Sequence, residues 1–236
     1  MSNTHFQFKQ FTVKHDKCAM KVGTDGVLLG AWIQTRNSQN ILDVGTGSGL
    51  IALMLAQKSK ALIDAIDIDG DACLQATENA LASPFSQRIN VYHEAFIQYS
   101  EHCKKIYDLI ASNPPFFIDS LKCPDMKRST ARHSDALTAI DLIENCRHIL
   151  APEGRLALIL PYEQLGLILE AAIDCKLYTC RRTDVSPHPD AIPKRFLIEL
   201  SPTYQVPTYD NLTIEYEHNQ YTEEYKTLTR AFYLKM

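Results

Sequence analysis

The sequence predicts an α/β fold, a mostly parallel sheet with helices on both of its faces. Three observations support this prediction. From residue 40 onward, short apolar runs alternate with segments of helical periodicity, the links between them are short, and a glycine-rich turn joins the first run to the first helix. Because strand-helix-strand units form right-handed crossovers, consecutive strands are expected to lie parallel, with their helices covering the sheet.

Five apolar runs are predicted to be the parallel strands. They occupy Asn40–Val44, Leu62–Asp67, Ile89–His93, Tyr107–Ser112 and Arg155–Leu160. Helices are predicted at about 48–57, from Gly70 onward, at 137–150 and at 162–174. The helix at 137–150 is indicated by apolar residues that recur at i+3 and i+4 spacing.

The C-terminal part of the chain departs from this alternation. Two strands, at 176–185 and 194–200, are separated only by the proline-rich segment 186–193. Because parallel neighbours need a long crossover, we expect this pair to be an antiparallel hairpin. The tail is predicted to add a strand at 212–216 and a helix with an aromatic face, whereas residues 1–39 are predicted to form an extension over one edge of the sheet.

The composition is that of an ordinary globular protein. The chain has 236 residues, 45% of them hydrophobic, and 24 Lys+Arg against 28 Asp+Glu, which gives a net charge of −4. These values exclude a disordered or fibrous chain, and the mild acidity counts against a general binder of polyanions. The N-terminus lacks the form of a signal peptide, and no apolar run reaches the roughly 20 residues needed to span a bilayer. We therefore expect a cytoplasmic protein without a membrane partner.

The cysteines count against a disulfide framework and against a metal site. There are seven, an odd number, and they are scattered without a C-x-x-C pair. Zinc sites and disulfide-rich domains both need closely spaced or paired cysteines, so we expect free thiols and no bound metal.

A glycine-rich loop follows the first predicted strand, in the order Asp43, Val, Gly45, Thr, Gly47, Ser and Gly49. Glycines at a strand-to-helix turn allow a ligand to approach the backbone at the helix N-terminus. Asp67 ends the next strand, where a carboxylate can accept hydrogen bonds from a ribose. The G-x-G-x-G spacing differs from the dinucleotide pattern, and Asp43 would repel a pyrophosphate but suit the cationic end of S-adenosylmethionine. The alternative is a turn that binds nothing.

A second motif, Asn113-Pro114-Pro115-Phe116, follows the fourth predicted strand. The two prolines fix a stiff loop at the carboxyl edge of the sheet, where ligands bind in open α/β folds. The Asn113 side chain and the Pro114 backbone each offer a carbonyl oxygen, and two acceptors on an exocyclic amine would direct its lone pair at an electrophile. Phe116 offers a ring on which a base can stack. A turn without function is the alternative.

These two motifs resemble those of the class I S-adenosylmethionine-dependent methyltransferases of the Asn-Pro-Pro-aromatic group, which modify base amines or side-chain amides. The segments Gly23–Trp32, Ala131–His133 and Tyr221–Lys235 resemble a branch of that group that methylates the N6 amine of an adenine in the tRNA anticodon stem-loop. The resemblance implies a Rossmann-like methyltransferase fold over 40–236, a seven-stranded sheet of order 3-2-1-4-5-7-6 with strand 7 antiparallel, and S-adenosylhomocysteine as the product.

The resemblance also implies roles for individual residues. Catalysis would fall to Asn113, Pro114 and Phe116. The cofactor would be bound by Thr24, Asp43, Gly45, Gly47, Gly49, Asp67, Glu94 and Asn113. The substrate would be bound by Pro115, Phe117, Arg132, His133, Lys194 and Arg195. The family usually has an acidic residue for the cofactor adenine where this chain has Ala95, so either the adjacent Glu94 or a backbone group takes that role.

Four alternatives stay open at this point. A methyltransferase of the same group could act on a guanine of ribosomal RNA or on a release-factor glutamine. A dinucleotide-dependent oxidoreductase is disfavoured by the glycine spacing, and a binding module without activity is also compatible with the motifs. The enzyme is expected to be a monomer with a tRNA partner.

The charge distribution favours a nucleic-acid partner more than the net charge does. Residues 9–21, 113–133 and 176–195 carry local charges of +3, +2 and +3. All three segments are predicted to border the carboxyl edge, where such a basic face could steer RNA to the site.

Overall fold

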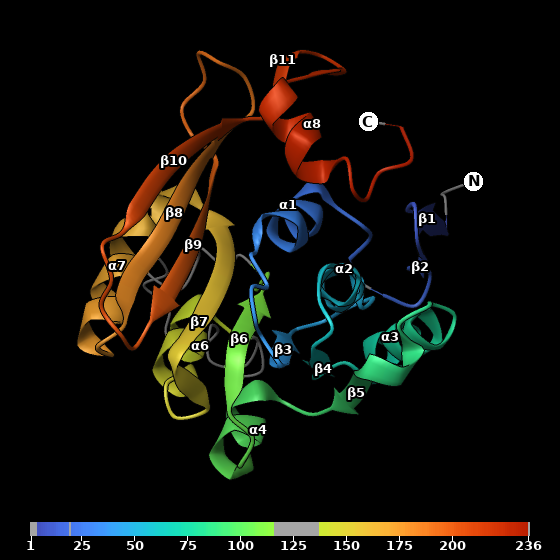
Figure 1. The fold of residues 1–236 in the computed structure, drawn as a ribbon, viewed down its shortest axis with the longest axis vertical. Helices are drawn as coiled ribbons and strands as arrows, with labels where there is room; N and C mark the ends of the chain where they lie inside the picture. The colour runs from blue at the N-terminus through green and yellow to red at the C-terminus, as the bar shows by residue number, and fades with distance from the viewer. Residues whose placement is uncertain (1–3, 19, 116–136, 236) are drawn as a thin grey trace, which may run out of the picture.

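The computed structural model describes residues 4–18, 20–115 and 137–235. Phe116, Phe117, Arg132 and His133, to which the sequence assigns roles, lie outside the described residues. The described chain contains an eight-stranded sheet of order β10-β8-β9-β7-β6-β3-β4-β5, with helices on both faces (Figure 1). Its strands are β3 (Asn40–Val44), β4 (Leu62–Asp67), β5 (Ile89–His93), β6 (Tyr107–Ser112), β7 (Leu150–Pro161), β8 (Tyr178–Ser186), β9 (Arg195–Ser201) and β10 (Thr208–Thr213).

The predicted strand order is confirmed for seven of these strands. The bounds of β3, β4, β5 and β6 agree with the prediction, and β9 is antiparallel to both β7 and β8. The prediction of seven strands is wrong by one, because β10 pairs in parallel with β8 and extends the sheet. The sequence predicts this strand too late, at 212–216. The first four residues of β10 are exposed, so they lack the apolar alternation by which a strand is recognised.

Each face of the sheet has its own apolar core. Side chains alternate along every strand, so that Ile41 packs on one face and Leu42 on the other. On the first face lie α1 (Thr24–Trp32), α2 (Leu50–Lys58), α3 (Gly70–Leu81) and α8 (Glu223–Thr229). On the second lie α4 (Phe96–His102), α6 (Ala139–Cys146) and α7 (Leu165–Asp174). None of the helices in the described ranges is long and apolar enough to cross a bilayer.

The N-terminal segment packs into the first core. Its strands β1 (His5–Gln7) and β2 (Thr12–Lys14) form an antiparallel pair, and Phe8 forms a bridge to Tyr233 near the C-terminus. The helix α1 packs so closely on α2 that a Cβ atom added at Gly30 would come within 2.7 Å of the Met54 sulfur. This close approach requires glycine at position 30. The C-terminal hairpin of β11 (Glu215–Glu217) and β12 (Gln220–Tyr221) precedes α8.

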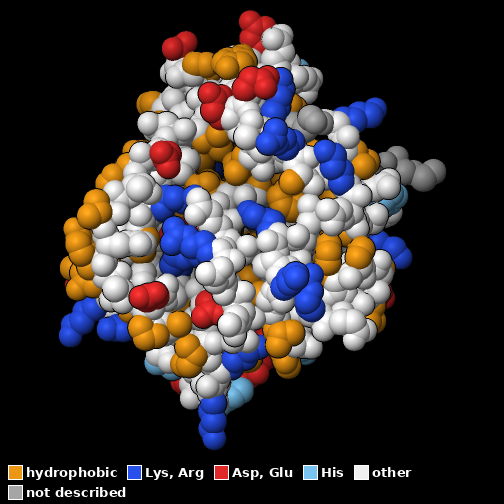
Figure 2. Space-filling view, in the orientation of Figure 1, with side chains coloured by type: hydrophobic (Ala, Val, Ile, Leu, Met, Phe, Trp, Pro, Cys, Tyr) orange, Lys and Arg blue, Asp and Glu red, His pale blue; other side chains and the backbone are white. Residues whose placement is uncertain are grey.

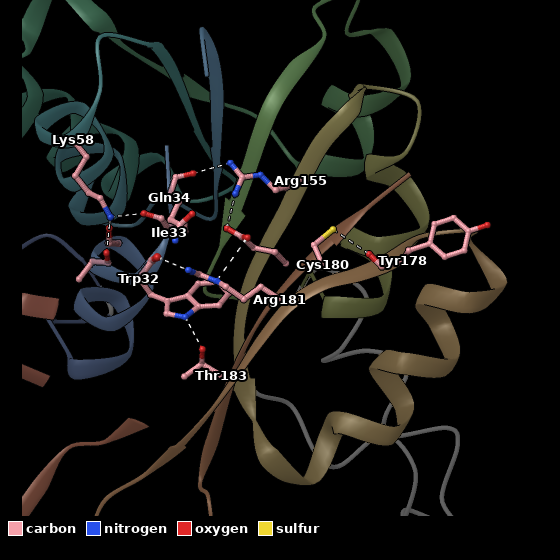
Figure 3. Close-up of polar contacts among 12 residues, drawn as sticks. Trp32, Ile33, Gln34, Lys58, Arg155, Tyr178, Cys180, Arg181 and Thr183 are labelled. Carbon is pink, nitrogen blue, oxygen red and sulfur yellow. Dashed lines mark hydrogen bonds and ion pairs between the residues drawn. The ribbon is translucent and has the colours of Figure 1, made fainter. Parts of the chain in front are cut away.

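Three cations from other elements hold the C-terminal end of α1, as Figure 3 shows. The ammonium of Lys58 donates to the carbonyl oxygens of Gly30, Ala31 and Ile33. Arg181 donates to the Trp32 carbonyl and Arg155 to that of Gln34, each at 2.7 Å. Since the last turn of α1 contains no basic residue of its own, these side chains neutralise the negative end of the helix. They thereby fix the helix whose first residues reach the carboxyl edge of the sheet.

Candidate active site

The central residues of the site follow the ends of three strands at the carboxyl edge of the sheet. Val44, the last residue of β3, lies opposite Ile66 of β4 and Ser112 of β6. The chain then continues from β3 into the glycine loop, from Ile66 to Asp67, and from Ser112 to Asn113. Because these strands are parallel and in register, the two motifs predicted to act together do meet at the carboxyl edge.

The glycine loop has the backbone conformation that its glycines allow. Gly45, Gly47 and Gly49 have φ values of +67°, +54° and +80°. A Cβ atom at Gly45 or Gly47 would meet no atom within 4 Å, whereas one at Gly49 would lie 3.3 Å from Ala76. Gly45 and Gly47 therefore leave open space for a ligand. Gly49 permits the close packing of the loop on α3.

Asp67 lies beside this open space. One oxygen of its carboxylate accepts a hydrogen bond from the Gly47 amide at 2.8 Å, and the other accepts from the Asp69 amide at 3.0 Å. The backbone of Ile66, the preceding residue, accepts from the amides of Gly45 and Thr46. The loop and the end of β4 are thus held together, with a carboxylate at the position predicted for a ribose ligand.

A cavity of about 370 Å³ lies between the glycine loop and the start of α1. One wall consists of the loop residues Gly45 to Ser48 with Leu50 and Ile51, and the opposite wall consists of Met20 to Gly26. Thr24, predicted from the resemblance to fold over the cofactor, lines this cavity, as does Asn113. The sequence did not single out Thr46 or Ser48, although both lie between the loop glycines.

Asn113 supplies an unpaired acceptor to the cavity. Its side-chain oxygen is buried and has no hydrogen-bond partner among the described residues. Pro114 is buried and Pro115 is exposed. The end of β6 is fixed next to β3 by a 2.8 Å hydrogen bond from the Ser112 hydroxyl to the Val44 carbonyl. An acceptor held on a rigid strand end can orient an N–H donor of a ligand, as the sequence predicted for Asn113.

Comparison with known proteins agrees with this geometry. The family model described as the methyltransferase small domain matches residues 18–175. The chain belongs to this methyltransferase family. A protein of Parabacteroides distasonis named tRNA1(Val) (adenine(37)-N6)-methyltransferase is 58% identical over the full length of both chains. A Bacteroides fragilis protein of the same name is 48% identical, again over the full length of both.

Solved structures confirm the fold of the methyltransferase. The crystal structure of a predicted O-methyltransferase from Agrobacterium tumefaciens matches with a TM-score of 0.67 at 20% identity, covering 88% of this chain and 96% of that one. A ribosomal protein L11 methylase from Lactobacillus delbrueckii matches with a TM-score of 0.55 at 18% identity, covering 76% and 77% of the two chains.

Asp43 of the methyltransferase is buried beneath the glycine loop and does not line the cavity. One carboxylate oxygen accepts from the Thr46 hydroxyl at 2.6 Å and from the Ala52 amide at 3.0 Å, and the other has no partner in the described structure. Burial raises the pKa of Asp43 to about 7, although the two hydrogen bonds oppose the shift. Asp43 therefore supports the loop from below, and its cofactor-binding role stays a prediction.

Glu94 also lies near the cofactor edge, but its carboxylate has another partner. Its backbone amide donates to the Asp67 carbonyl at 2.9 Å, whereas its side chain lies 2.6 Å from the ring nitrogen of His102. The backbone at this position is thus next to the predicted ribose site, and the role of the side chain toward adenine stays a prediction.

Arg195 has a structural partner that the sequence did not indicate. Its Nε atom donates to the Asp25 carboxylate at 2.9 Å, and Nη1 donates to the Lys194 carbonyl. The pair connects the start of β9 with the N-terminus of α1, two segments 170 residues apart. Lys194 is exposed at the same edge. Substrate contacts by Lys194 and Arg195 remain predictions.

The predicted basic face is partly wrong. Lys176 precedes β8, whose first residues lie toward the amino end of the parallel strands. Arg181 and Arg182 lie further along β8, and the pairing through β9 and β7 places them level with Ala111 and Ser112. None of these three cations lines the cavity as the described residues form it, since Arg181 donates to the Trp32 carbonyl and Arg182 pairs with Asp184. Figure 2 likewise shows Lys and Arg side chains in several separate groups on the face that it views. In the described ranges, no group of three His, Cys, Asp or Glu side chains could hold a metal ion.

Proposed function

We propose that the enzyme transfers the methyl group of S-adenosylmethionine to the N6 amine of adenine 37 in tRNA1(Val). The observation that carries this proposal is the buried oxygen of Asn113, which has no partner among the described residues and lies at the wall of a cavity that the positive-φ glycine loop also lines. An acceptor in that position suits an amine that must be aligned with a methyl donor. The names of the full-length relatives support the choice of the amine and the RNA.

The residues present fit S-adenosylmethionine. Gly45 and Gly47 leave the open space that a ligand against the loop requires, and Asp67 presents a carboxylate for ribose hydroxyls. When bound, the cofactor supplies an electrophilic methyl group on a sulfonium. Thr24 and Asp25 would enclose it from the opposite wall.

The role proposed for Asn113 and Pro114 is alignment. Two carbonyl oxygens accept the two N–H groups of the adenine amine, so the nitrogen lone pair points at the methyl carbon. With the cofactor bound, the amine nitrogen would bond to the methyl carbon as the bond from that carbon to sulfur breaks with its electron pair, and the amine would lose one proton to solvent. No general base is needed if positioning supplies the rate. Phe116 and Phe117 are proposed to stack on the base, and Pro115, Arg132, His133 and Lys194 to contact the tRNA.

Methylation of tRNA lacking this modification tests the proposal. The protein is incubated with labelled S-adenosylmethionine and either tRNA1(Val), 16S and 23S ribosomal RNA, or a release factor, and the methyl group is located by mass spectrometry. N6-methyladenosine at position 37 is the expected product. Detection of methylguanosine or methylglutamine would overturn the choice of substrate. If none of these substrates were methylated, the proposed reaction would be overturned. A tRNA substrate also leads us to propose a cytoplasmic enzyme acting as a monomer.

The variant Asn113→Ala tests the alignment role. We expect turnover to fall by about 100-fold while cofactor affinity changes little, because the amide acts on the amine. Asn211→Ala is a matched control, since Asn211 is exposed on the edge strand β10. Turnover within threefold of the wild type in Asn113→Ala would contradict this role.

A further inference from the structure

Asn79, on α3, connects two parts of the chain that are far apart in the sequence. Its side chain is 2% exposed. The amide nitrogen donates to the Ser48 carbonyl and to the Lys14 carbonyl, each at 2.8 Å, and the amide oxygen accepts from the Lys14 backbone N–H at 3.0 Å. Both backbone groups of Lys14 are therefore bound by one side chain, and the remaining donor of that side chain is bound to the glycine loop.

One partner of Asn79 lies in a wall of the cavity, and the other lies in the segment that leads to the opposite wall. Ser48 is part of the glycine loop and lines the cavity directly. Lys14 is the last residue of β2, and the chain continues from it to the second wall, which starts at Met20. Gln75 on the same helix accepts from the Lys17 amide at 3.2 Å and donates to Glu78, so among the described residues its hydrogen bonds reach the N-terminal segment but not the loop.

The loop itself depends on such contacts. Gly45, Gly47 and Gly49 all have positive φ, which glycine adopts without strain but with much backbone freedom to lose, so contacts from neighbouring side chains help to order the loop. The primary amide of Asn79 has two donors and one acceptor, and all three contacts described above use them. Neither a carboxylate nor an apolar side chain of the same size can reproduce this set.

We infer that Asn79 is the positioning residue that sets the distance between the two walls of the cavity, and hence the affinity for the cofactor. The inference rests on the proposed function, because that proposal identifies the ligand as S-adenosylmethionine or S-adenosylhomocysteine. Asn79 acts through the glycine loop and the N-terminal segment, without touching the ligand.

The test is the affinity of the full-length protein for S-adenosylhomocysteine, measured by titration calorimetry. We expect Asn79→Asp, which keeps the shape and loses both donors, to bind at least tenfold more weakly than the wild type, and Asn79→Leu to bind no more tightly than that. Gln75→Leu should have a smaller effect, since only one wall loses a contact. Thr77→Val is the control, because in the described part of the chain the Thr77 hydroxyl donates to the Cys73 carbonyl within α3 and to neither wall.

A second readout distinguishes positioning from loss of stability. Steady-state kinetics should show a raised KM for S-adenosylmethionine in Asn79→Asp, with the KM for tRNA within twofold of the wild type. Folded Asn79 variants that bind S-adenosylhomocysteine within twofold of the wild type would overturn the inference. A wild type that binds none of it would instead overturn the proposed function.

If both Asn79 variants fail to fold, hydrogen exchange of the wild type decides the question. S-adenosylhomocysteine should protect the amides of residues 13–18 together with those of 45–49, because one side chain connects the two segments. Protection of 45–49 without protection of 13–18 would overturn the inference.

Discussion

The pKa of Asp43 leads to a quantitative prediction about stability. Burial raises this pKa from an ordinary value of 3.8 to about 7. At 1.36 kcal/mol for each pH unit, the difference corresponds to about 4 kcal/mol in the free energy of unfolding, as an upper value. Below pH 3.8 the carboxyl group is protonated in both states, and this stability is fully present. As the pH rises toward 7, the unfolded chain releases the proton while the folded protein keeps it, so the stability is lost.

The perturbation is Asp43→Asn in the protein without cofactor. An asparagine can still accept from the Thr46 hydroxyl and the Ala52 amide, and it carries no charge at any pH. We therefore expect the stability of the variant, relative to the wild type, to increase between pH 4.5 and 7.5. The slope should approach about 1.4 kcal/mol per pH unit in the middle of this range.

Urea denaturation at pH 4.5, 6.0, 7.5 and 8.5 measures this difference, and subtracting the two curves removes the titration of all other groups. Asp210→Asn is the control, since Asp210 is exposed on β10. The difference in the free energy of unfolding between Asp210→Asn and the wild type should stay the same over this pH range. If Asp43→Asn also gave a pH-independent difference, the burial of a costly carboxylate beneath the loop would be refuted.

Three further predictions concern the walls of the cavity and the helix between them. Gly47→Ala should lower the free energy of unfolding by about 1 kcal/mol because of the positive φ, which denaturation measures. It should also weaken the binding of S-adenosylhomocysteine by more than this strain alone explains, since the added methyl group enters the open space beside the loop, and calorimetry measures this effect. A double-mutant cycle with Asp25→Asn and Arg195→Gln should give a coupling of about 0.5–1 kcal/mol in kcat/KM, and additive effects would show that the pair does not position the site. Lys58→Met should destabilise the protein by about 2 kcal/mol in urea, because three carbonyl groups lose their donor, whereas Lys60→Met at an exposed site should be neutral.

The parallel part of the sheet could be predicted because its strands are buried on both faces. A strand such as Ile63 to Ile66 is apolar in every position except Asp64, and glycine or helix signals bound it clearly. The edge strand β10 could not be placed in the same way. Its first residues, Thr208 to Asn211, are exposed and polar, and the pairing with β8 through backbone groups leaves no trace in the pattern of side chains.

The site could be predicted where local geometry determines it. The conformation of Gly45 and Gly47 and the position of Asn113 follow from residues that are close in the sequence, so the motifs indicated them. Asn79 and the Asp25–Arg195 pair act through contacts between segments 31 to 170 residues apart. An asparagine in a helix and a charged pair of this separation have no local signature, so only the folded chain reveals them.

The described structure leaves two buried groups near the carboxyl edge unsatisfied, one at the cavity wall and one beneath the glycine loop. The free oxygen of Asp43 and the free oxygen of Asn113 are both buried acceptors at the ends of the adjacent strands β3 and β6. A buried acceptor without a partner costs about 1–3 kcal/mol, and more when it is charged, so these two groups lower the stability of the folded protein near the cavity. A cofactor with a cationic end and an amine substrate with two N–H groups would reduce both costs. The enzyme is therefore expected to gain stability from its cofactor at pH 8 more than at pH 5, because Asp43 is charged only at the higher pH.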